Sequence, residues 1–439
     1  MKKRIISALL AVVLVLGCLA GCSSTKEEGG APAANANSDD VIVIKFPTTQ
    51  CGVNTAAAVV QELIDQFNEE YAGKYYIEKE EIPGDANYLD KIKVQLSTGD
   101  LPPVVYGAGM NVLDLLLEKD MALDLTPYIE ADPEWKAMYS ESALAVNSRD
   151  GKIYASSNEN SIIGYFYNKD MFAQAGIEKP AETWEELWEQ CEKLKAAGFT
   201  PFSLDTIGSA WTTLLWMGAM VATANDDGLA FMQQTHPSDY NTPEMIAAVE
   251  NVITMFREYA TVDSLGGSAS TAENHFNSGN VAMYANGPWV IGDFSNPTKA
   301  SEGFEEKVGV AVYPGSFVYD APLQGYIITE KEDPKMIEAC LAMVKFFTSA
   351  DAQKLALDMQ GMVPVYSGVE ISDTARENFP LLTEFLEKAN AAEIHTDNLE
   401  TLMYTNMYEV TSQSLPLLVS GDMTAEEFCQ ALTEAAAKN

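Results

Sequence analysis

The stretch Phe276–Phe294, FNSGNVAMYANGPWVIGDF, decides how the rest of the chain can be arranged. Its apolar residues Val281 and Met283 predict a short buried strand, and Gly287-Pro288 ends that strand with a tight corner. A helix or turn is expected to begin near Trp289. A tryptophan directly after such a corner lies at the rim of an element, where its flat face can meet a ligand. The alternative is a Trp289 that is buried where two domains meet.

Length and charge limit the classes of protein that fit this chain. Its 439 residues exceed what one hydrophobic core organises, so two or more domains are expected. The 27 basic and 64 acidic residues give a net charge of −37. Nucleic acid is therefore not expected as a partner, because the phosphate backbone needs clustered Lys and Arg. Anionic ligands are also disfavoured, because only Arg149, Arg257 and Arg376 follow residue 21 and bidentate capture of an anion usually uses Arg.

The N-terminus is predicted to be a targeting segment and not part of the fold. Lys2-Lys3-Arg4 precedes the apolar run Ile5–Leu16, which is shorter than the ~20 residues that span a bilayer. The following Leu19-Ala20-Gly21-Cys22 resembles the bacterial lipobox. This resemblance implies that residues 1–21 are a lipoprotein signal peptide and that Cys22 is acylated and anchors the chain. A plain secretory peptide that is cut nearby is the alternative. Residues 22–40 are small and polar and predict a flexible tether.

Strands and helices alternate from Val41 onward, which predicts an α/β fold. Strands are expected at 41–44, 104–106, 162–167, 308–313 and 325–329. Helices are expected over 55–71 and 183–198, and further helices begin near 242, 333, 349 and 424. Two of these helices begin with the pattern of a capping box, Thr183-x-x-Glu186 and Thr424-x-x-Glu427.

Cysteines and histidines do not form a pattern that predicts chemistry. Most of the cysteines beyond the tether fall on the apolar stripe of an expected helix, where a free thiol packs as a small hydrophobe. Export permits disulfides, but the spacing identifies no pair among Cys51, Cys191, Cys340 and Cys429. The histidines are isolated and are expected at surface or capping positions: His236, His275 and His395.

Motifs of enzymes and cofactor sites were sought and are not present. The sequence has no Walker A loop, no Gly-x-Ser-x-Gly elbow, no His-Glu-x-x-His and no dinucleotide fingerprint. We therefore expect a binding protein without a metal or cofactor, and no catalytic residues. A glycosidase dyad stays open, because 64 carboxylates create many accidental pairs.

Two separate passages resemble the bacterial solute-binding proteins of sugar ABC importers, extracellular solute-binding protein family 1. One is the signature Gly-x-x-Ala-Met…Gly-Pro-Trp, which ends at Trp289, and the other is YNKDMFAQAGI…PAETWEEL over 167–187. A third passage, Ser97–Pro103, departs from the family's Ser-Gly-Asp-x-Pro-Asp turn, because Pro103 replaces the last aspartate. The resemblance implies a two-lobed periplasmic-binding-protein-like fold (type II), with a ligand cleft between lobes that hinge strands join.

The same resemblance implies how the chain is divided. Lobe 1 is expected to comprise residues 41–160 and 327–370, and lobe 2 residues 161–326 and 371–439. The chain would then cross between the lobes near 159–162, 324–329 and 365–372. A lobe made of separate stretches can rotate with little internal repacking.

Ten ligand contacts are implied by the resemblance, and they combine aromatic faces with polar groups. Aromatic rings cover the C–H face of a sugar, while carboxylates and amides bind its hydroxyls. Trp211 could instead be a helix-core residue, and core packing explains Tyr404 and Tyr408, four residues apart on one expected helical face, nearly as well. The candidates are Gln50, Asn54, Asn111, Glu159, Asn160, Asp205, Trp211, Trp289, Tyr404 and Tyr408.

The resulting prediction is a substrate-binding lipoprotein that captures a neutral sugar or oligosaccharide and delivers it to the permease of an ABC importer. It would be a monomer, exported and lipid-anchored to the cell membrane on its extracellular or periplasmic side. Two other classes of function stay open. One is a binder of a peptide, polyamine or other cation on the same fold, and the other is a surface glycosidase.

Overall fold

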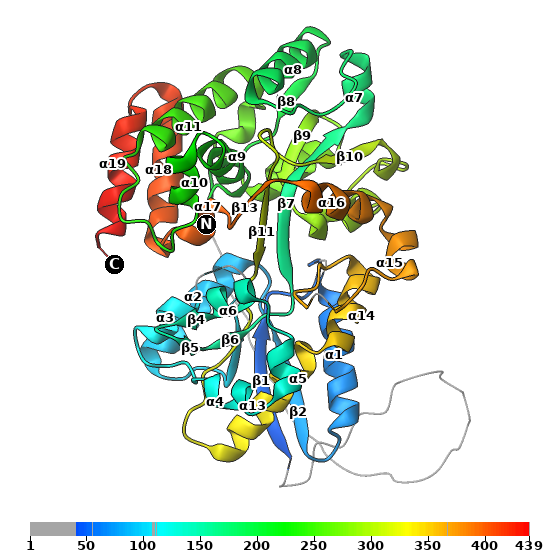
Figure 1. Ribbon diagram of the computed structural model, residues 1–439, viewed down its shortest axis with the longest axis vertical. Coiled ribbons are helices and arrows are strands. Elements are labelled where there is room, and N and C mark those ends of the chain that lie inside the picture. Colours follow the sequence, from blue (N-terminus) through cyan, green and yellow to red (C-terminus); the bar gives the residue numbers. More distant parts are fainter. Residues whose placement is uncertain (1–40, 55, 108–109, 111, 367, 439) are drawn as a thin grey trace, which may run out of the picture. The chain divides into compact units, whose positions relative to one another are not determined.

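The computed structural model describes residues 41–54, 56–107, 110, 112–366 and 368–438 as two lobes (Figure 1). The expected signal peptide and tether, the acylation site Cys22 and the candidate ligand contact Asn111 lie outside the described residues. Within the described ranges, no helix combines the length and apolar character that a membrane crossing requires.

Lobe 1 holds small sheets with helices packed against them. Its strands are β1 (Ile42–Thr48), β2 (Tyr75–Glu81), β3 (Val104–Tyr106), β4 (Ser148–Arg149), β5 (Lys152–Ile153), β6 (Ala155–Ser156) and β12 (Tyr326–Ile328). Its helices are α1 (Ala57–Glu70), α2 (Asp85–Thr98), α3 (Val112–Leu117), α4 (Thr126–Glu130), α5 (Pro133–Ala137), α6 (Glu141–Asn147), α13 (Pro334–Phe347) and α14 (Ala350–Gln360). Strand β1 pairs in parallel with β2 and contacts β3, and β12 lies antiparallel between β3 and β6.

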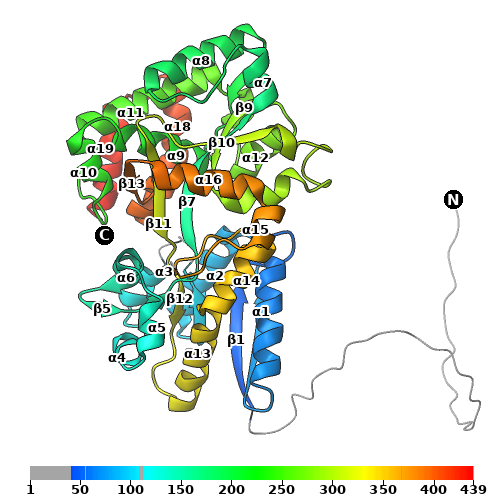
Figure 2. The ribbon, with the colours of Figure 1, turned by 45° about the vertical axis from the view of Figure 1, so that its right-hand side comes forward.

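Helix α1 shows why the apolar pattern places these elements. Its apolar residues recur every three or four positions, which puts them on one face of the helix. That face packs against β2, α13 and α14, and Figures 1 and 2 show α1 and α13 beside β1. The buried residues are the ones that the sequence pattern indicates: Val59, Val60, Leu63, Ile64 and Phe67.

Lobe 2 is built on a sheet with the strand order β13-β11-β7-β9-β8, and β10 pairs with the second half of β7. Its strands are β7 (Asn160–Asn168), β8 (Thr200–Phe202), β9 (Val281–Asn286), β10 (Val308–Ala311), β11 (Phe317–Pro322) and β13 (Ile394–Thr396). Its α-helices are α7 (Lys169–Gln174), α8 (Trp184–Ala196), α9 (Trp211–Ala222), α10 (Asp226–Met232), α11 (Pro243–Thr254), α12 (Ala269–Asn277), α15 (Asp373–Asn378), α16 (Pro380–Ala391), α17 (Leu399–Leu402), α18 (Thr405–Ser420) and α19 (Ala425–Ala436). The lobe also contains a π-helical turn, η1 (Met255–Tyr259), and the 3₁₀ turns η2 (Val262–Ser264), η3 (Pro288–Phe294) and η4 (Glu305–Lys307).

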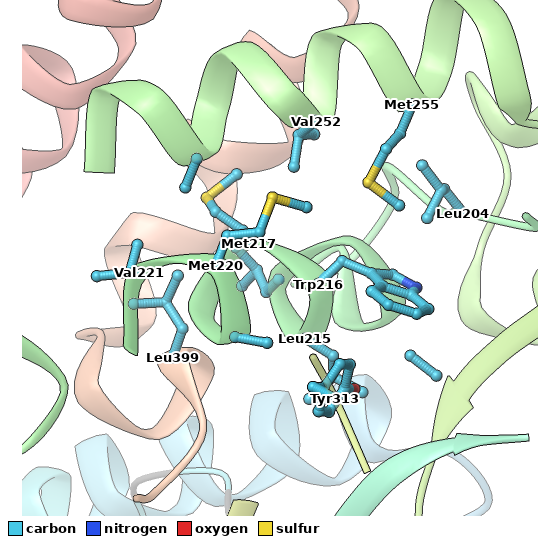
Figure 3. Close-up of a cluster of buried hydrophobic side chains, with 14 of the residues drawn as sticks. Leu204, Leu215, Trp216, Met217, Met220, Val221, Val252, Met255, Tyr313 and Leu399 are labelled. Carbon is cyan, nitrogen blue, oxygen red and sulfur yellow. The ribbon is translucent and has the colours of Figure 1, made fainter. Parts of the chain in front are cut away.

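Helix α9 lies at the centre of the lobe 2 core. Every residue of this helix after Trp211 is buried. Figure 3 shows Trp216 and Met217 of α9 between Val252 of α11 on one side and Tyr313 on the other. A helix that is apolar all round belongs in the interior of a domain. The packing therefore fixes the position of α9, and with it the position of Trp211 at its first turn.

The stretches that the sequence analysis expects to cross between the lobes lie side by side in the structure. Glu159 forms an isolated β-bridge with Pro364, and its carbonyl accepts a hydrogen bond from the backbone N–H of Leu323 at 3.0 Å. The N–H of Asn160 donates to the carbonyl of Val363 at 2.7 Å. These pairings support the expected crossings near 159–162, 324–329 and 365–372. We keep the exact lobe boundaries, 41–160 with 327–370 and 161–326 with 371–439, as a proposal.

The predicted α/β fold is confirmed, and most of the expected elements are present. The capping box at Thr424 is complete, because Thr424 and Glu427 each bond the other's backbone N–H. The capping box expected at Thr183 forms only in part. Thr183 caps Glu186, but the Glu186 carboxylate accepts a hydrogen bond from the N–H of Glu182, one residue before the cap, at 2.8 Å.

The described cysteines are all free and buried, and Cys191, Cys340 and Cys429 have no exposed surface. Their interpretation as packing residues is confirmed.

Candidate functional site

The corner that carries Trp289 is as the sequence predicts. Strand β9 is buried along its whole length, Gly287 follows it, and η3 begins at Pro288. Gly287 has an ordinary extended backbone that any residue could adopt. Glycine is needed at this position because a side chain would not fit. A Cβ placed on Gly287 would lie 2.1 Å from Cζ3 and 2.3 Å from Cη2 of the Trp289 ring. The half-buried indole of Trp289 therefore lies directly against the backbone of Gly287.

A partly buried ion cluster holds η3 in place. Nζ of Lys299 lies 2.7 Å from Oδ2 of Asp293 on η3 and 3.2 Å from Oε1 of Glu273 on α12. Burial raises the pKa of Glu273, while the positive charge of Lys299 acts in the opposite direction. Two acidic groups around one ammonium fix the end of η3 against α12. The segment after Trp289 is thus anchored without using the ring itself.

Trp211 lies beside Trp289. The centres of the two indole rings are 6.3 Å apart and their planes are inclined by 48°. The indole N–H of Trp211 donates to Oδ1 of Asn286 at 3.4 Å, and Asn286 in turn bonds the hydroxyl of Tyr284 at 2.6 Å. Trp211 is half-buried at the start of α9 and packs against the lobe 2 core, so both interpretations, ligand contact and helix-core residue, stay open. Trp211 and Trp289 thus stay predicted ligand contacts that lie side by side.

Asp205 is placed at the start of the same helix and is mainly engaged there. Its Oδ1 accepts hydrogen bonds from the hydroxyl of Thr212 at 2.7 Å and from the N–H of Thr213 at 3.3 Å. Its Oδ2 is buried without a partner. Burial raises the pKa of Asp205 to about 6, and the bonds from α9 oppose that rise. Its direct contact with a ligand stays a prediction.

The tyrosines near the C-terminus are arranged differently from the sequence prediction. Tyr404 and Tyr408 do not share a helical face, because Tyr404 lies at the N-cap position before α18 with an extended backbone, and its side chain makes no capping hydrogen bond. Its ring stacks on His236, and the hydroxyl of Tyr408 donates to the carbonyl of Glu400 at 3.2 Å. Residues four positions apart share one face only where both of them belong to the same helix.

Glu400 is an acidic residue that the sequence analysis missed. Burial raises its pKa to about 7, a hydrogen bond with Ser209 lowers it, and the charges of Asp205 and Asp85 raise it further. Asp85 belongs to α2 of lobe 1, whereas Glu400 and Asp205 belong to lobe 2. The two lobes therefore bring carboxyl groups within electrostatic range of one another. Nothing in the local sequence around Glu400 distinguishes it from the many solvated acidic residues.

Lobe 1 contributes polar groups around the end of β1. Gln50 is 7% exposed and its Oε1 is buried without a partner. Asn54 is exposed, and its Oδ1 accepts a hydrogen bond from the N–H of Ala56 at the start of α1, 2.8 Å away. Burial raises the pKa of Asp85, while a hydrogen bond with Thr49 lowers it. Gln50, Thr49 and Asp85 thus form a polar group at the end of the strand.

The first crossing adds Glu159 and Asn160. Glu159 is 7% exposed, and burial raises its pKa to about 7. Asn160 donates from Nδ2 to Oδ1 of Asp320 at 2.7 Å, and its Oδ1 is buried without a partner. The charge of Glu159 raises the pKa of Tyr106 and Tyr326, so it lies near the edge of the lobe 1 sheet.

The candidates therefore divide into two classes by chemistry. One consists of two half-buried indoles, and the other of carboxyl and amide groups that are buried or that accept few hydrogen bonds. Burial is the largest cause of the raised pKa of each carboxyl group in this set: Asp85, Glu159, Asp205 and Glu400. Within the described part of the chain, no group of three or more His, Cys, Asp or Glu could hold a metal ion. Such a set offers hydrogen-bond acceptors and aromatic faces.

Two surface hollows lie away from these residues. One is beside α4, α5 and α6, with Ile129 and Leu144 in its wall, and the other is beside β7 and α7, with Tyr167 and Phe172. Neither contains a candidate contact. The candidate site is therefore described by its side chains and their partners.

Two lobes joined by paired crossings, with indoles and polar groups from separate stretches, define the class of the solute-binding proteins. The family of bacterial extracellular solute-binding proteins matches residues 62–380, and the chain belongs to that family. Among relatives, a protein named as a binding protein in Brucella abortus is 28% identical over 240 residues, which is 54% of each chain. The chain spans about half the length of such relatives. A protein named as an ABC transporter periplasmic-binding protein in Escherichia coli, YcjN, is 25% identical over 73% of each chain.

Solved structures confirm the two-lobed fold. A chitin oligosaccharide binding protein superposes with a TM-score of 0.78 at 21% identity, over 91% of this chain and 99% of that one. A Streptococcus pneumoniae solute-binding protein in complex with the blood group A-trisaccharide gives 0.76 at 19% identity, over 90% and 100%. Maltose-bound MalE3 of T. maritima gives 0.71 at 18% identity, over 90% and 99%. The predicted family and fold class are therefore confirmed.

Proposed function

We propose that this chain is the substrate-binding lipoprotein of a carbohydrate ABC importer and that it captures a neutral sugar or oligosaccharide by lobe closure. The observation that supports this best is the pair Trp211 and Trp289, whose half-buried rings lie 6.3 Å apart at an angle of 48°. Two inclined aromatic faces suit the flat C–H faces of consecutive sugar rings. The names of the solved structures above, which include chitin oligosaccharide, blood group A-trisaccharide and maltose, support the same substrate class.

The polar residues support a neutral ligand. Sugar hydroxyls donate hydrogen bonds, and Gln50, Glu159 and Asn160 offer acceptors that are buried or unpartnered. An anionic ligand would need Arg or Lys at the site, because burying a negative charge beside carboxyl groups without a partner is costly. The relative in Brucella abortus named as an sn-glycerol-3-phosphate-binding periplasmic protein is 27% identical, but over only 36% of this chain. We therefore expect this chain to differ from it in ligand.

Delivery and anchoring complete the proposal. The closed form would be recognised by the membrane permease of the importer, and acylated Cys22 would hold the monomeric protein to the cell membrane with residues 22–40 as a tether. The protein would face the extracellular or periplasmic side and would bind its ligand without converting it.

A screen followed by one pair of variants tests the sugar proposal. A panel of oligosaccharides is tested for a rise in melting temperature, because a ligand that binds only the folded state stabilises it. Trp289→Ala should then weaken binding of the best sugar by about 1–3 kcal/mol, the scale of a lost aromatic contact. Trp188→Ala is the matched control, because this half-buried tryptophan stacks on Tyr259 and is not a candidate ligand contact. If Trp289→Ala and Trp188→Ala bind the sugar with equal affinity, Trp289 does not stack on the ligand.

A cationic solute is the second candidate, because carboxyl groups from both lobes lie within electrostatic range of one another: the charges of Asp85 and Asp205 both raise the pKa of Glu400. Polyamines and basic peptides therefore belong in the same panel. Stabilisation by a polyamine and by no sugar would replace the carbohydrate proposal with this one. Product analysis after incubation with each sugar checks the expectation that nothing is hydrolysed.

A further inference from the structure

A buried amide lies between Trp211 and Trp289, which we call the tryptophan pair. Asn286 is the last residue of β9, is 4% exposed, and pairs across the sheet with Gly164 of β7. Trp211 is the first residue of α9, and Trp289 belongs to η3. The amide therefore projects from a strand of the lobe 2 sheet toward two helical segments that come from separate stretches of the chain.

Two N–H groups fix the orientation of this amide. The indole Nε1–H of Trp211 donates to Oδ1 of Asn286 at 3.4 Å, and the backbone N–H of Gly287 donates to the same oxygen at 2.9 Å. An N–H group can only donate, so the amide oxygen must face both of them and the amide nitrogen must face away. The oxygen has two lone pairs and satisfies both donors at once. One atom thus joins stretches that are 75 positions apart.

The amide nitrogen is held on its other side. Nδ2 of Asn286 donates to the hydroxyl of Tyr284 at 2.6 Å. Tyr284 is two residues earlier on β9, so both side chains leave the strand on the same face. Its side chain is 1% exposed, and its ring stacks on Phe276 of α12 with the ring centres 5.6 Å apart and an angle of 27°. Asn286 cannot turn without losing these hydrogen bonds, so its amide is a rigid link.

Gly287 extends this constraint to Trp289. The indole of Trp289 lies against Gly287, since a Cβ on this glycine would be 2.1 Å from Cζ3 of the ring. The N–H that Asn286 accepts belongs to the same glycine. Trp211 is thus positioned through its own N–H, and Trp289 through the backbone on which its ring rests. The separation of 6.3 Å and the inclination of 48° between the rings therefore both depend on one acceptor.

The hydrogen bond also decides what Trp211 can offer to a ligand. An indole has one N–H donor and no acceptor. Because Asn286 accepts that N–H, the ring of Trp211 is left to contact a ligand through its apolar faces. This favours contact with the C–H groups of a ligand over a hydrogen bond to one of its hydroxyls.

From this geometry we propose that Asn286 is a positioning residue for ligand binding, whose amide oxygen holds the tryptophan pair at the spacing and inclination that the ligand meets. The proposal rests on the proposed function, in which the rings of the pair stack on a sugar. Asn286 acts through the rings and does not touch the ligand. Without its oxygen the two N–H groups lose their shared partner, and the rings adopt several arrangements in place of one. Binding must then select one of these arrangements, and affinity falls.

Three substitutions separate the acceptor from the shape of the side chain. Asn286→Leu keeps a similar volume and removes the oxygen. Asn286→Asp keeps an oxygen that accepts both N–H groups in either protonation state, and its second oxygen can interact with the hydroxyl of Tyr284. Asn286→Ser has a hydroxyl that is too short to reach both donors, and it leaves room for water.

Asn147→Leu is the matched control. Asn147 is a fully buried amide of lobe 1 that also joins separate stretches. Its Oδ1 accepts a hydrogen bond from the backbone N–H of Gly325 at 3.2 Å, and its Nδ2 donates to Oγ of Ser157 at 2.6 Å. Its loss costs stability in a comparable way but removes no hydrogen bond of the tryptophan pair.

Fluorine NMR of protein that contains 5-fluorotryptophan reports the rings directly and without ligand. The sequence has six tryptophans, and Trp211→Phe and Trp289→Phe assign the resonances of the pair. The affinity for the best oligosaccharide of the screen is measured by titration calorimetry, and the melting temperature is measured on the same samples. These readouts separate a change of ring position from a general loss of stability.

We expect Asn286→Leu to shift both resonances of the tryptophan pair, to leave those of the other tryptophans in place, and to weaken sugar binding about 5- to 30-fold, less than the loss of a whole ring. Asn286→Asp should bind more tightly than Asn286→Leu and return both resonances toward the parent. Asn147→Leu should melt earlier than the parent with both resonances unchanged. If Asn286→Leu does not fold, Asn286→Ser is judged by the same measurements.

Three results would overturn the proposal while the proposed function stands. They are unchanged resonances of the pair, an Asn286→Asp variant that binds as weakly as Asn286→Leu, and an unchanged affinity where Trp289→Ala weakens binding. If Trp211→Ala and Trp289→Ala both bind the sugar like the parent, the stacking in the proposed function is wrong, and the positioning role in binding is wrong with it.

Discussion

Gly287→Ala offers a sharp test of how the Trp289 ring is positioned, because it changes none of the candidate residues themselves. The added methyl would lie 2.1, 2.3 and 2.6 Å from Cζ3, Cη2 and Cε3 of the ring. Carbon atoms pack at about 3.5–4.0 Å, so the ring must move by roughly 1.5 Å. The backbone itself is not strained, since φ −104° and ψ 178° suit alanine.

The magnitude follows from what this displacement changes. A half-buried ring that moves by this distance loses most of its face-to-face contact with a bound sugar, which is worth about 1–3 kcal/mol. We therefore expect affinity to fall about 5- to 150-fold. Stability should change by less than about 1 kcal/mol, because alanine also lowers the entropy of the unfolded chain by an amount worth about 0.4–1 kcal/mol. Titration calorimetry and thermal unfolding measure the two quantities on the same samples.

Gly292→Ala is the matched control, since Gly292 lies in the same short helix η3 and a Cβ there would meet no atom within 4 Å. It should bind like the parent. If Gly287→Ala also binds like the parent, either the ring relaxes without loss or Trp289 does not touch the ligand, and Trp289→Ala distinguishes these outcomes. A Gly287→Ala protein that melts far below the parent would show that the ring belongs to the core, and the reasoning would be wrong.

The other predictions concern anchoring, protonation and lobe movement. Cys22→Ser should release the protein from the membrane fraction, and a variant that still sediments with membranes after a high-salt wash would contradict the lipoprotein proposal. Burial raises the pKa of Glu159 to about 7, from a usual value of ~4.3, so folding loses stability as the pH rises between these values. Glu159→Gln should therefore be more stable than the parent above pH 7, by up to about 3 kcal/mol, and equal to it near pH 4; urea unfolding at both pH values measures this, and a constant difference would refute it. Small-angle scattering should show a smaller radius of gyration with saturating sugar, and an unchanged radius with binding confirmed in the same sample would exclude closure.

The sequence alone predicted the elements that depend on short-range patterns. The apolar residues of α1 predicted its buried face correctly, because residues three and four positions apart lie on the same side of a helix. The strand, corner and helical turn around Trp289 follow from a buried β run and a Gly-Pro break. The Thr424 cap formed as expected, because its partners are three residues apart. Local geometry decides all of these.

Short-range sequence patterns could not predict the contacts between distant stretches of the chain. Tyr404 and Tyr408 have helical spacing, yet α18 begins after Tyr404, and only the fold directs that ring onto His236. The buried side of α11 consists of Met245, Ala248, Val249 and Val252, because the packing of this helix against α9 decides which side faces inward.

What the sequence by itself determined is thus the family, the α/β fold and the aromatic signature, all of which are written in residues close together in the chain. The tertiary structure alone decided that Asp85 of one lobe lies within electrostatic range of Glu400 of the other, that Trp211 lies beside Trp289, and that Asp114 meets His236. These pairs are separated by 78 to 315 positions, so no periodicity or spacing rule connects them. The physical reason is that such contacts follow from the burial of whole helices and strands, whose packing places side chains together that share no local pattern.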